Sequence, residues 1–208
     1  MSRPLTPPTP DRAMFAGLVG EVVSTFAPVT EAAPAAIAVQ FLVAVGNAAG
    51  RQPHFYVGET RHGLNEDLLV VGRSSRSRKG DGKNVALCPL EVADSAWGAH
   101  VASGLSSGEG VIHHVRDPVE ARNKKGDLVL VDEGVSDKRL LVVETEFSQP
   151  LKMFRRDGNT LSNVLRDAWD GKAVLRTLTK KSPTRATEAH ISIKIGRASC
   201  RERVYVLV

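Results

Sequence analysis

The chain has 208 residues, of which 42% are hydrophobic and 25% are charged, and its formal net charge is +5. This composition is typical of a folded globular domain and excludes disorder of the whole chain. No apolar run reaches the roughly 18 residues that a bilayer-spanning helix needs, so we expect no contact with a membrane. Cys88 and Cys200 give neither a disulfide framework nor a metal-ligand spacing, and the expected location is cytoplasmic.

The first quarter of the chain predicts helices. Residues 1–12 form a Pro-rich lead without the apolar stretch of a signal peptide, and we expect them to be disordered. Residues 14–26 have apolar side chains near helical spacing. Residues 35–49, which end at Gly50, are apolar nearly all round and therefore predict a buried helix. Residues 13–52 are thus expected to form an N-terminal helical segment.

Two short runs, residues 53–57 and 67–71, predict strands. The second is a continuous apolar run of the kind that parallel sheets bury on both faces. It leads directly into a loop, residues 72–81, that is rich in glycine, serine and arginine. Residues 84–102 have a helical pattern that Pro89 interrupts.

The second half of the chain continues this alternation. The expected elements, in chain order, are a glycine-rich turn and short helix at residues 104–116, an exposed hairpin at 117–138, a strand at 139–146, a helix at 160–169, and strands at 174–178 and 190–193. Strands that alternate with helices and glycine loops predict an α/β fold with a mainly parallel sheet.

The loop at residues 72–81 has features of a phosphate site. A glycine-rich loop between a buried strand and a helix turns its backbone N–H groups toward an anion, and a lysine neutralises further charge. The sequence does not match the P-loop pattern G-x-x-x-x-G-K-[ST], because six residues separate Gly72 from Lys79 and Gly80. Taken alone, a solvated basic turn explains this loop equally well.

Two carboxylates extend the pattern. Glu144 ends a predicted strand, which is where P-loop enzymes place the acid that holds the Mg²⁺ shell. Glu109 begins a helix after the glycine turn, where a carboxylate can polarise the attacking water. Each also has a purely structural explanation, Glu144 as the solvated end of a buried strand and Glu109 as a helix N-terminal acid. The order and rough separation of the loop and the two acids favour the functional interpretation.

Five segments stand in one order along the chain: Asn47-Ala-Ala-Gly-Arg51, Gly72-x-Ser-Ser-x-x-Arg-Lys-Gly80, Gly104-Leu-Ser-Ser-Gly-Glu-Gly110, Leu140-Leu-Val-Val-Glu-Thr-Glu-Phe147 and Leu165-Arg-Asp-Ala-Trp-Asp-Gly171. Together they resemble a family of uncharacterised RecA-like proteins of phages, plasmids and integrated elements, which are described as helicase- or primase-associated replication ATPases. The resemblance runs from about Phe15 to Ile193. It implies a RecA-like P-loop domain that binds ATP and Mg²⁺, acts on DNA and commonly assembles as a homo-oligomeric ring.

The resemblance also implies site residues. Lys79 becomes the phosphate lysine, Glu109 the catalytic acid between the two nucleotide motifs, and Glu144 the strand-tip acid at the metal. The implied nucleotide-binding set is Gly72, Ser74, Ser75, Arg76, Arg78, Lys79, Gly80 and Asp81.

The chain departs from the family pattern at three positions. The family has Gly where Ser77 stands, Thr or Ser where Asp81 stands, and Glu where Thr145 stands. Asp81 matters most, because the missing hydroxyl normally ligates Mg²⁺ and a carboxylate crowds the phosphates. Two functions therefore remain open: the ATP-binding part of a DNA-replication ATPase whose intact parent hydrolyses ATP, and a non-hydrolysing DNA- or partner-binding module that retains the fold.

The C-terminal residues follow a different pattern. Residues 194–204, Lys-Ile-Gly-Arg-Ala-Ser-Cys-Arg-Glu-Arg-Val, match the translation of a common sequencing-library adapter, with a basic solvated tail as the alternative. Residues 194–208 hold four basic residues against one acidic residue, which is +3 of the +5 and leaves a balance of +2 that predicts no phosphate-binding face by itself. We therefore assign residues 53–193 to a truncated RecA-like domain and expect residues 194–208 to be a non-native tail with few contacts.

Overall fold

The computed structural model describes residues 9–70, 79–177, 184–196 and 206–207. Its centre is a five-stranded sheet in the order β11-β3-β10-β7-β4. The strands span Leu68–Val70 (β3), Val101–Ala102 (β4), Arg139–Glu144 (β7), His190–Gly196 (β10) and Val206–Leu207 (β11). The strands β3, β10, β7 and β4 are parallel, and β11 runs antiparallel to β3. The expectation of an α/β fold with a mainly parallel sheet is confirmed.

The two central strands are buried on both faces, which explains their continuous apolar sequence. Leu140 and Val142 of β7 pack into a cluster with α5 and α7, whereas Leu141 and Val143 pack into a cluster with α2 and α3. The register of β10 runs from His190 opposite Arg139 to Ile195 opposite Glu144. Side chains that alternate along β7 therefore serve two separate halves of the core.

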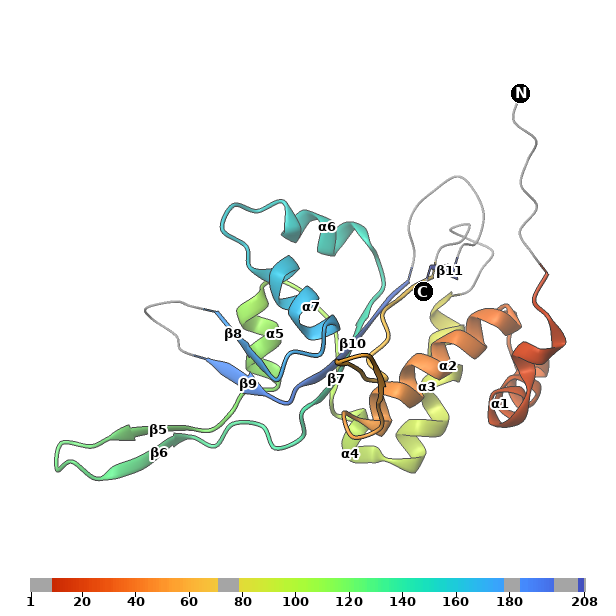
Figure 1. Ribbon diagram of the computed structural model, residues 1–208. Coiled ribbons are helices and arrows are strands. Elements are labelled where there is room, and N and C mark those ends of the chain that lie inside the picture. The colour runs from red at the N-terminus through yellow and green to blue at the C-terminus, as the bar shows by residue number, and fades with distance from the viewer. Residues whose placement is uncertain (1–8, 71–78, 178–183, 197–205, 208) are drawn as a thin grey trace.

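Four helices lie on one side of this sheet (Figure 1). They are α1 (Gly17–Phe26), α2 (Pro34–Ala49), α3 (Lys79–Ala93) and α4 (Ser95–Gly98), preceded by the 3-10 turn Arg12–Phe15 and with a second, Ala27–Val29, between α1 and α2. α2 is the predicted buried helix, and it ends where Gly50 adopts a φ of +75°. Because α2 contacts β3, β7 and β10 directly, the helical residues 13–52 form one layer of the main domain.

The other side of the sheet carries α5 (Gly108–His114) and α7 (Leu161–Trp169), and α6 (Ser148–Phe154) packs against α7 (Figure 1). Three antiparallel hairpins complete the described residues: β1–β2 (Phe55–Val57 and Thr60–His62), β5–β6 (Val119–Arg122 and Leu128–Asp132) and β8–β9 (Val174–Arg176 and Arg185–Thr187). The β5–β6 hairpin, which was expected, projects away from the body of the molecule. No helix of the described residues is long and apolar enough to cross a membrane.

Several expected elements differ in the structure. The strand expected at residues 53–57 belongs to an exposed hairpin outside the main sheet. α3 continues through Pro89, because Leu87 and Leu90 on either side of it pack into the core and outweigh the lost hydrogen bond. The expected helix at 84–102 is divided in the structure. α3 ends at Ala93, the short helix α4 follows, and Val101–Ala102 forms β4.

The two tryptophans lie in different environments. Trp97 is fully buried, as expected of a core residue. Trp169, in contrast, is 47% exposed. It is the last residue of α7, where Ala168 and Val164 already supply the buried surface.

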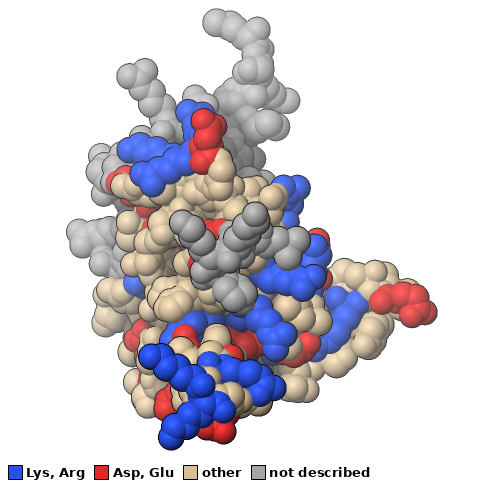
Figure 2. Space-filling model, turned by 90° about the vertical axis from the view of Figure 1, so that its left-hand side faces the viewer, with Lys and Arg blue, Asp and Glu red and all other residues tan. Residues whose placement is uncertain are grey.

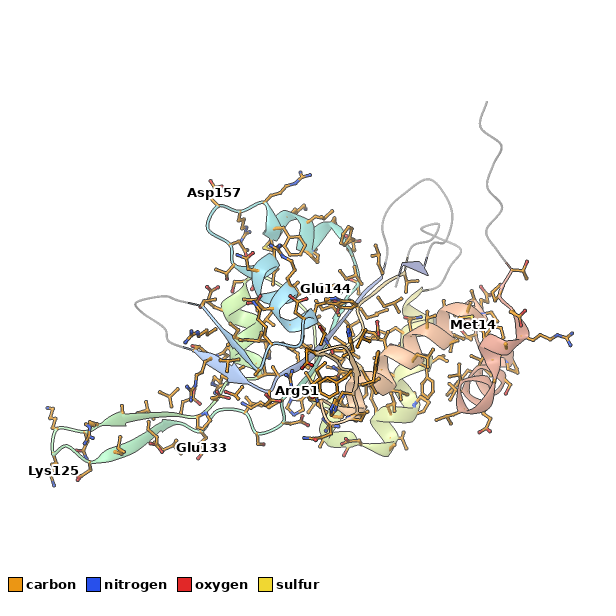
Figure 3. The ribbon with its side chains drawn as sticks, viewed as in Figure 1. Met14, Arg51, Lys125, Glu133, Glu144 and Asp157 are labelled. Atoms are coloured by element: carbon orange, nitrogen blue, oxygen red, sulfur yellow. The ribbon has the colours of Figure 1, made fainter. Side chains whose placement is uncertain are left out.

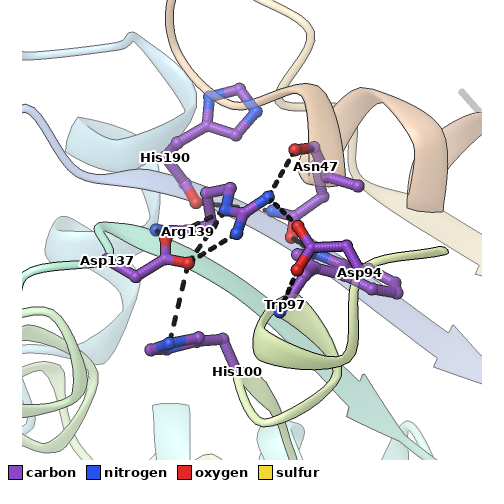
Figure 4. Close-up of polar contacts among 8 residues, drawn as sticks. Asn47, Asp94, Trp97, His100, Asp137, Arg139 and His190 are labelled. Carbon is purple, nitrogen blue, oxygen red and sulfur yellow. Dashed lines mark hydrogen bonds and ion pairs between the residues drawn. The ribbon is translucent and has the colours of Figure 1, made fainter. Parts of the chain in front are cut away.

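The buried side chain of Asn47 joins four elements at the amino ends of the central strands (Figure 4). Its Nδ2 donates to the carbonyls of Leu140, at 3.0 Å, and His190, at 3.4 Å, while its Oδ1 accepts from Trp97 Nε1 at 2.9 Å. Leu140 lies near the start of β7, His190 is the first residue of β10, and Trp97 belongs to α4. One amide thus provides hydrogen-bonding partners for buried polar groups of three other elements.

Arg139 forms a second network beside Asn47 (Figure 4). Its guanidinium donates to the carbonyl of Ala48, to Asp94 and to both oxygens of Asp137. Burial acts to raise the pKa of Asp137, but the hydrogen bonds from Arg139 outweigh it and hold that pKa below its ordinary value. Helix α2, helix α4 and strand β7 are therefore tied by both an amide and an ion pair.

The tail expectation is wrong for part of residues 194–208. Lys194, Ile195 and Gly196 complete β10, and they are the residues of β10 that pair with β3. Val206–Leu207 also pairs with β3. Backbone pairing along β3 accepts almost any side chain, which explains how these residues join the sheet. Residues 197–205 and 208 lie outside the described residues.

We predict that Asn47→Ala lowers the free energy of unfolding by roughly 2–4 kcal/mol, because three buried hydrogen bonds lose a partner. Urea denaturation followed by circular dichroism measures this change. Asn84, which is exposed on α3, provides the control, since Asn84→Ala should change stability by less than about 0.5 kcal/mol. Equal stability of the two variants would contradict this role of Asn47.

A second prediction concerns the end of β10. Truncation after Ile193 removes every residue that pairs β10 with β3, so we expect it to lower stability by roughly 2–3 kcal/mol relative to truncation after Gly196. Urea denaturation of the two truncated chains and the full chain measures the difference. Three equal stabilities would show that residues 194–196 contribute nothing to the domain.

Candidate functional site

The four parallel strands end at one edge of the sheet, and Glu144 lies at this carboxyl edge. The residues of the predicted loop Gly72, Ser74, Ser75, Arg76 and Arg78 lie outside the described residues, as does Ser77. The loop leaves β3 after Val70 and enters α3 at Lys79. The first turn of α3 consists of Lys79, Gly80 and Asp81, of which the structure describes the backbone only.

Glu144 is the last residue of β7 and is 7% exposed. Its Oε1 accepts hydrogen bonds from the backbone N–H groups of Gly104, at 2.7 Å, and Leu105, at 2.6 Å. Its Oε2 has no hydrogen-bonding partner among the described residues. Glu144 is therefore buried, in contrast to a solvated strand end, and it attaches the loop after β4 to the end of β7.

The loop that Glu144 holds leads into α5, which carries Glu109 in its first turn. Ser107 caps this helix by accepting from the backbone N–H of Gly110 at 3.1 Å. The half-buried Glu109 accepts a 2.9 Å hydrogen bond from the hydroxyl of Thr160, at the start of α7. Thr160 was not identified from the sequence, because a lone threonine 51 residues away has no pattern that links it to Glu109.

Gly108 permits the contact between Glu109 and Thr160. A Cβ at Gly108 would lie 2.6 Å from Thr160 Oγ1 and 2.6 Å from Val164 Cγ2, so α5 and α7 approach as closely as glycine allows. The loop from Gly104 to Ser107 covers a cavity of about 60 Å³. That volume is far below the several hundred Å³ of typical small-molecule pockets, so this cavity does not hold a nucleotide.

β3 and β7 are parallel strands of one sheet, as expected, but they are not neighbours. β10 lies between them, with Gly196 opposite Val70 and Ile195 opposite Glu144. Two strand spacings separate β3 from β7, which is about 10 Å. The end of β3 and Glu144 therefore lie at the same edge, and the sequence predicted the strand at residues 190–193 but not its position between them.

Lys194 is buried in the strand between these two positions and is 6% exposed. Its side chain lies on the α2–α3 side with Gln40 and Lys83, and Gln40 Oε1 has no hydrogen-bonding partner among the described residues. Burial and, to a smaller extent, the nearby charge of Lys83 together lower the pKa of the Lys194 ammonium to about 8. No carboxylate of the described residues forms an ion pair with it.

We predict that Lys194→Met stabilises the protein at pH 7 by about 3 kcal/mol, because it removes a buried ammonium group whose pKa is lowered. The lysine keeps its proton more tightly in the unfolded chain, so its cost is largest below pH 8. It falls as the pH rises from about 8 to 10.5, where the folded protein has already released the proton.

Thermal unfolding of the two proteins between pH 6 and 10.5 measures this difference. Asp67, whose pKa burial raises to about 7, titrates in both proteins and cancels. Lys152→Met, an exposed site on α6, is the matched control. A stability difference that does not change with pH would contradict the buried-charge interpretation.

Comparison with models of known protein families and with curated proteins gave no match. Among the described residues, no group of three or more His, Cys, Asp or Glu side chains is placed to hold a metal ion. Glu109 and Glu144 therefore do not belong to a cluster of three or more such side chains among the described residues.

Proposed function

We propose that this chain is the ATP-binding part of a RecA-like ATPase whose intact form acts on DNA during replication of a mobile element. The observation that carries the proposal is the common position of three features at the carboxyl edge of the parallel sheet. These are the end of β3 with the loop that follows it, the buried Glu144, and the loop leading to Glu109. Open α/β sheets bind their ligands outside the carboxyl ends of the strands.

The start of α3 supports a phosphate site. α3 has 15 residues and begins at Lys79 immediately after the loop, so its unpaired N–H groups and its dipole favour an anion at that end. Lys79 neutralises phosphate charge, and the backbone from Ser74 to Gly80 surrounds the phosphates. In the proposed function, Gly72, Ser75, Arg76, Arg78 and Asp81 border this site.

Glu144 and Glu109 fit the two carboxylate roles. Magnesium in nucleotide sites is held by one or two carboxylates together with waters and phosphates, and it supplies charge neutralisation at the phosphates. Oε2 of Glu144, which has no hydrogen-bonding partner among the described residues, is suited to bind a water of that shell, whereas Oε1 is occupied by Gly104 and Leu105. Thr160 orients the Glu109 carboxylate, which is the group proposed to accept a proton from the attacking water.

A non-hydrolysing module is the second candidate function. Asp81 lies in the first turn of α3, where the related proteins carry a hydroxyl, and Thr145 follows Glu144 where they carry a second acid. These two positions favour loss of hydrolysis with retention of the fold. Measurement of both nucleotide binding and phosphate release distinguishes the two candidates.

DNA is proposed as a partner of the intact protein, and one face of the molecule shows how its basic side chains are distributed. The face in Figure 2 carries Lys and Arg side chains in several groups, with Asp and Glu among them. Such a face provides local phosphate contacts but no continuous basic stripe. Assembly of several copies into a ring is part of the same proposal.

We predict that Lys79→Ala weakens binding of a fluorescent ATP analogue by tenfold or more, since about 1.5–3 kcal/mol is typical of a hydrogen bond to a charged group. Lys124→Ala, at the exposed tip of the β5–β6 hairpin, is the matched control and should bind as the unaltered chain does. Fluorescence titration in Mg²⁺ measures both affinities. Equal affinities of the two variants would identify Lys79 as a solvated loop lysine.

A further inference from the structure

A second cavity lies at the opposite, amino edge of the sheet. Its volume is about 340 Å³, which lies within the range of small-molecule pockets. It is enclosed by the β1–β2 hairpin, the end of α7 and His190, the first residue of β10. It shares no lining residue with the carboxyl-edge site; Figure 3 labels Arg51, which lines this cavity, and Glu144, which ends β7 at the carboxyl edge.

Aromatic rings line the mouth of this cavity. The ring of Phe55 stacks on the imidazole of His62, with centroids 5.2 Å apart and an interplanar angle of 18°. The side chain of Phe55 is 55% exposed and that of Trp169 is 47% exposed. Core packing does not account for either ring, and half-exposed flat rings suit a planar ligand that stacks on them.

The floor of the cavity is fixed by Arg51. Its guanidinium donates to the carbonyls of Ala189, at 3.2 Å, and Gly171, at 2.6 Å, and forms an ion pair with Glu188. These contacts occupy Arg51 and join α2, the end of α7 and the start of β10. Arg51 thus has a structural role and connects the segments that surround the cavity.

Arg61 provides a cation inside the cavity. Its Nη2 donates to the carbonyl of Arg51, and its Nε and Nη1 have no partner among the described residues. Arg61 is half-buried, whereas the two carboxylates of the lining, Glu66 and Asp170, are exposed to solvent. The inner part of the cavity therefore presents a guanidinium with free donors, and the acids lie in water.

His190 lines the same cavity, and nearby charges affect its pKa. Burial lowers the pKa of His190, a hydrogen bond to the carbonyl of Gly46 opposes this, and the charges of Arg51, Arg61 and Arg139 lower it further. The charge of Arg61 thus reaches the inner end of the cavity, where its guanidinium can bind an anionic group.

We propose that this cavity binds a nucleotide unit, with its base stacked on Trp169 and Phe55 and its phosphate bound by Arg61. The unit is either a free nucleotide or one residue of a single strand, since both offer a planar base and a phosphate. Arg guanidinium groups match phosphate geometry, and base stacking on aromatic side chains is tolerant of sequence. The site is distinct from the proposed ATP site, and neither depends on the other.

Tryptophan fluorescence tests this proposal directly. The chain has two tryptophans; Trp97 is fully buried, so a ligand that quenches emission by stacking acts at Trp169. We expect saturable quenching of the full chain by thymidine monophosphate, by a ten-residue oligothymidylate, or by both. Quenching by the mononucleotide alone identifies a free nucleotide as the ligand, and quenching by the oligonucleotide alone identifies a strand.

Three variants locate the site. Arg61→Ala should weaken both phosphate-bearing ligands by about tenfold and leave binding of thymidine unchanged, and Arg61→Lys should restore part of the loss. Trp169→Leu should weaken an end-labelled oligothymidylate by roughly fivefold or more in fluorescence anisotropy, if the strand is the ligand, or the mononucleotide in equilibrium dialysis. Arg122→Ala, on the exposed β5–β6 hairpin, is the matched charge control.

Two results would overturn the proposal. One is an absence of quenching by thymidine monophosphate and by the oligonucleotide at millimolar concentration, with circular dichroism showing a folded chain. The other is quenching that Arg61→Ala leaves unchanged. The Lys79→Ala variant separates this test from that of the ATP site, because it should lose ATP binding and still bind thymidylate.

Discussion

The fold depends on one buried amide at the amino ends of the two central strands. Asn47 is the point where α2 meets Leu140 of β7 and His190, the first residue of β10, and it also receives the indole N–H of Trp97. All three hydrogen bonds are buried, so the loss of the amide would cost free energy at each of them. The side chain therefore sets the position of α2 on the sheet and the register of the layers beneath it.

The contacts of Asn47 also affect the opposite, carboxyl edge of the sheet. Because β7 and β10 are held at their amino ends, their carboxyl ends are held as well, and Glu144 occupies a fixed place beside the loop that leads to Glu109. Arg139 strengthens the same junction through Asp94 and Asp137. Residues that resemble family motifs, such as Asn47 and Arg51, thus act in the framework, and the candidate chemistry lies on other segments.

Patterns that extend over many residues predicted the fold well. The apolar helix at residues 35–49, the strand at 139–144 and the hairpin at 117–138 all carry periodicities that need no tertiary information. Two-residue β4 has no periodicity, and its place at the sheet edge comes from pairing with Leu141 and Val142. The sequence predicted a helix break at Pro89, but α3 continues through it because the neighbouring residues pack into the core. Trp169 is exposed because it is the last residue of α7, at the surface.

The site was predictable in its positions but not in its contacts. Glu144 and Glu109 follow a strand and begin a helix, as the sequence indicated. The hydrogen bonds from Gly104 and Thr160, and the insertion of β10 between β3 and β7, arise from segments far apart in the chain. The amino-edge cavity was missed for the same reason, since Arg61, Trp169 and His190 share no local pattern.

The long sequence separation between β3 and β10 affects folding during synthesis. The backbone N–H of Ile193 bonds to Asp67 across 126 residues, and β3 pairs with residues 194–196. Leu68 and Val70 therefore stay without their neighbouring strand until residues 194–196 have left the ribosome. Contacts of such long range close slowly, and an unpaired apolar strand is prone to associate with other chains meanwhile. Yield in the cell should thus respond to synthesis rate and chaperones more than the stability of the finished domain suggests.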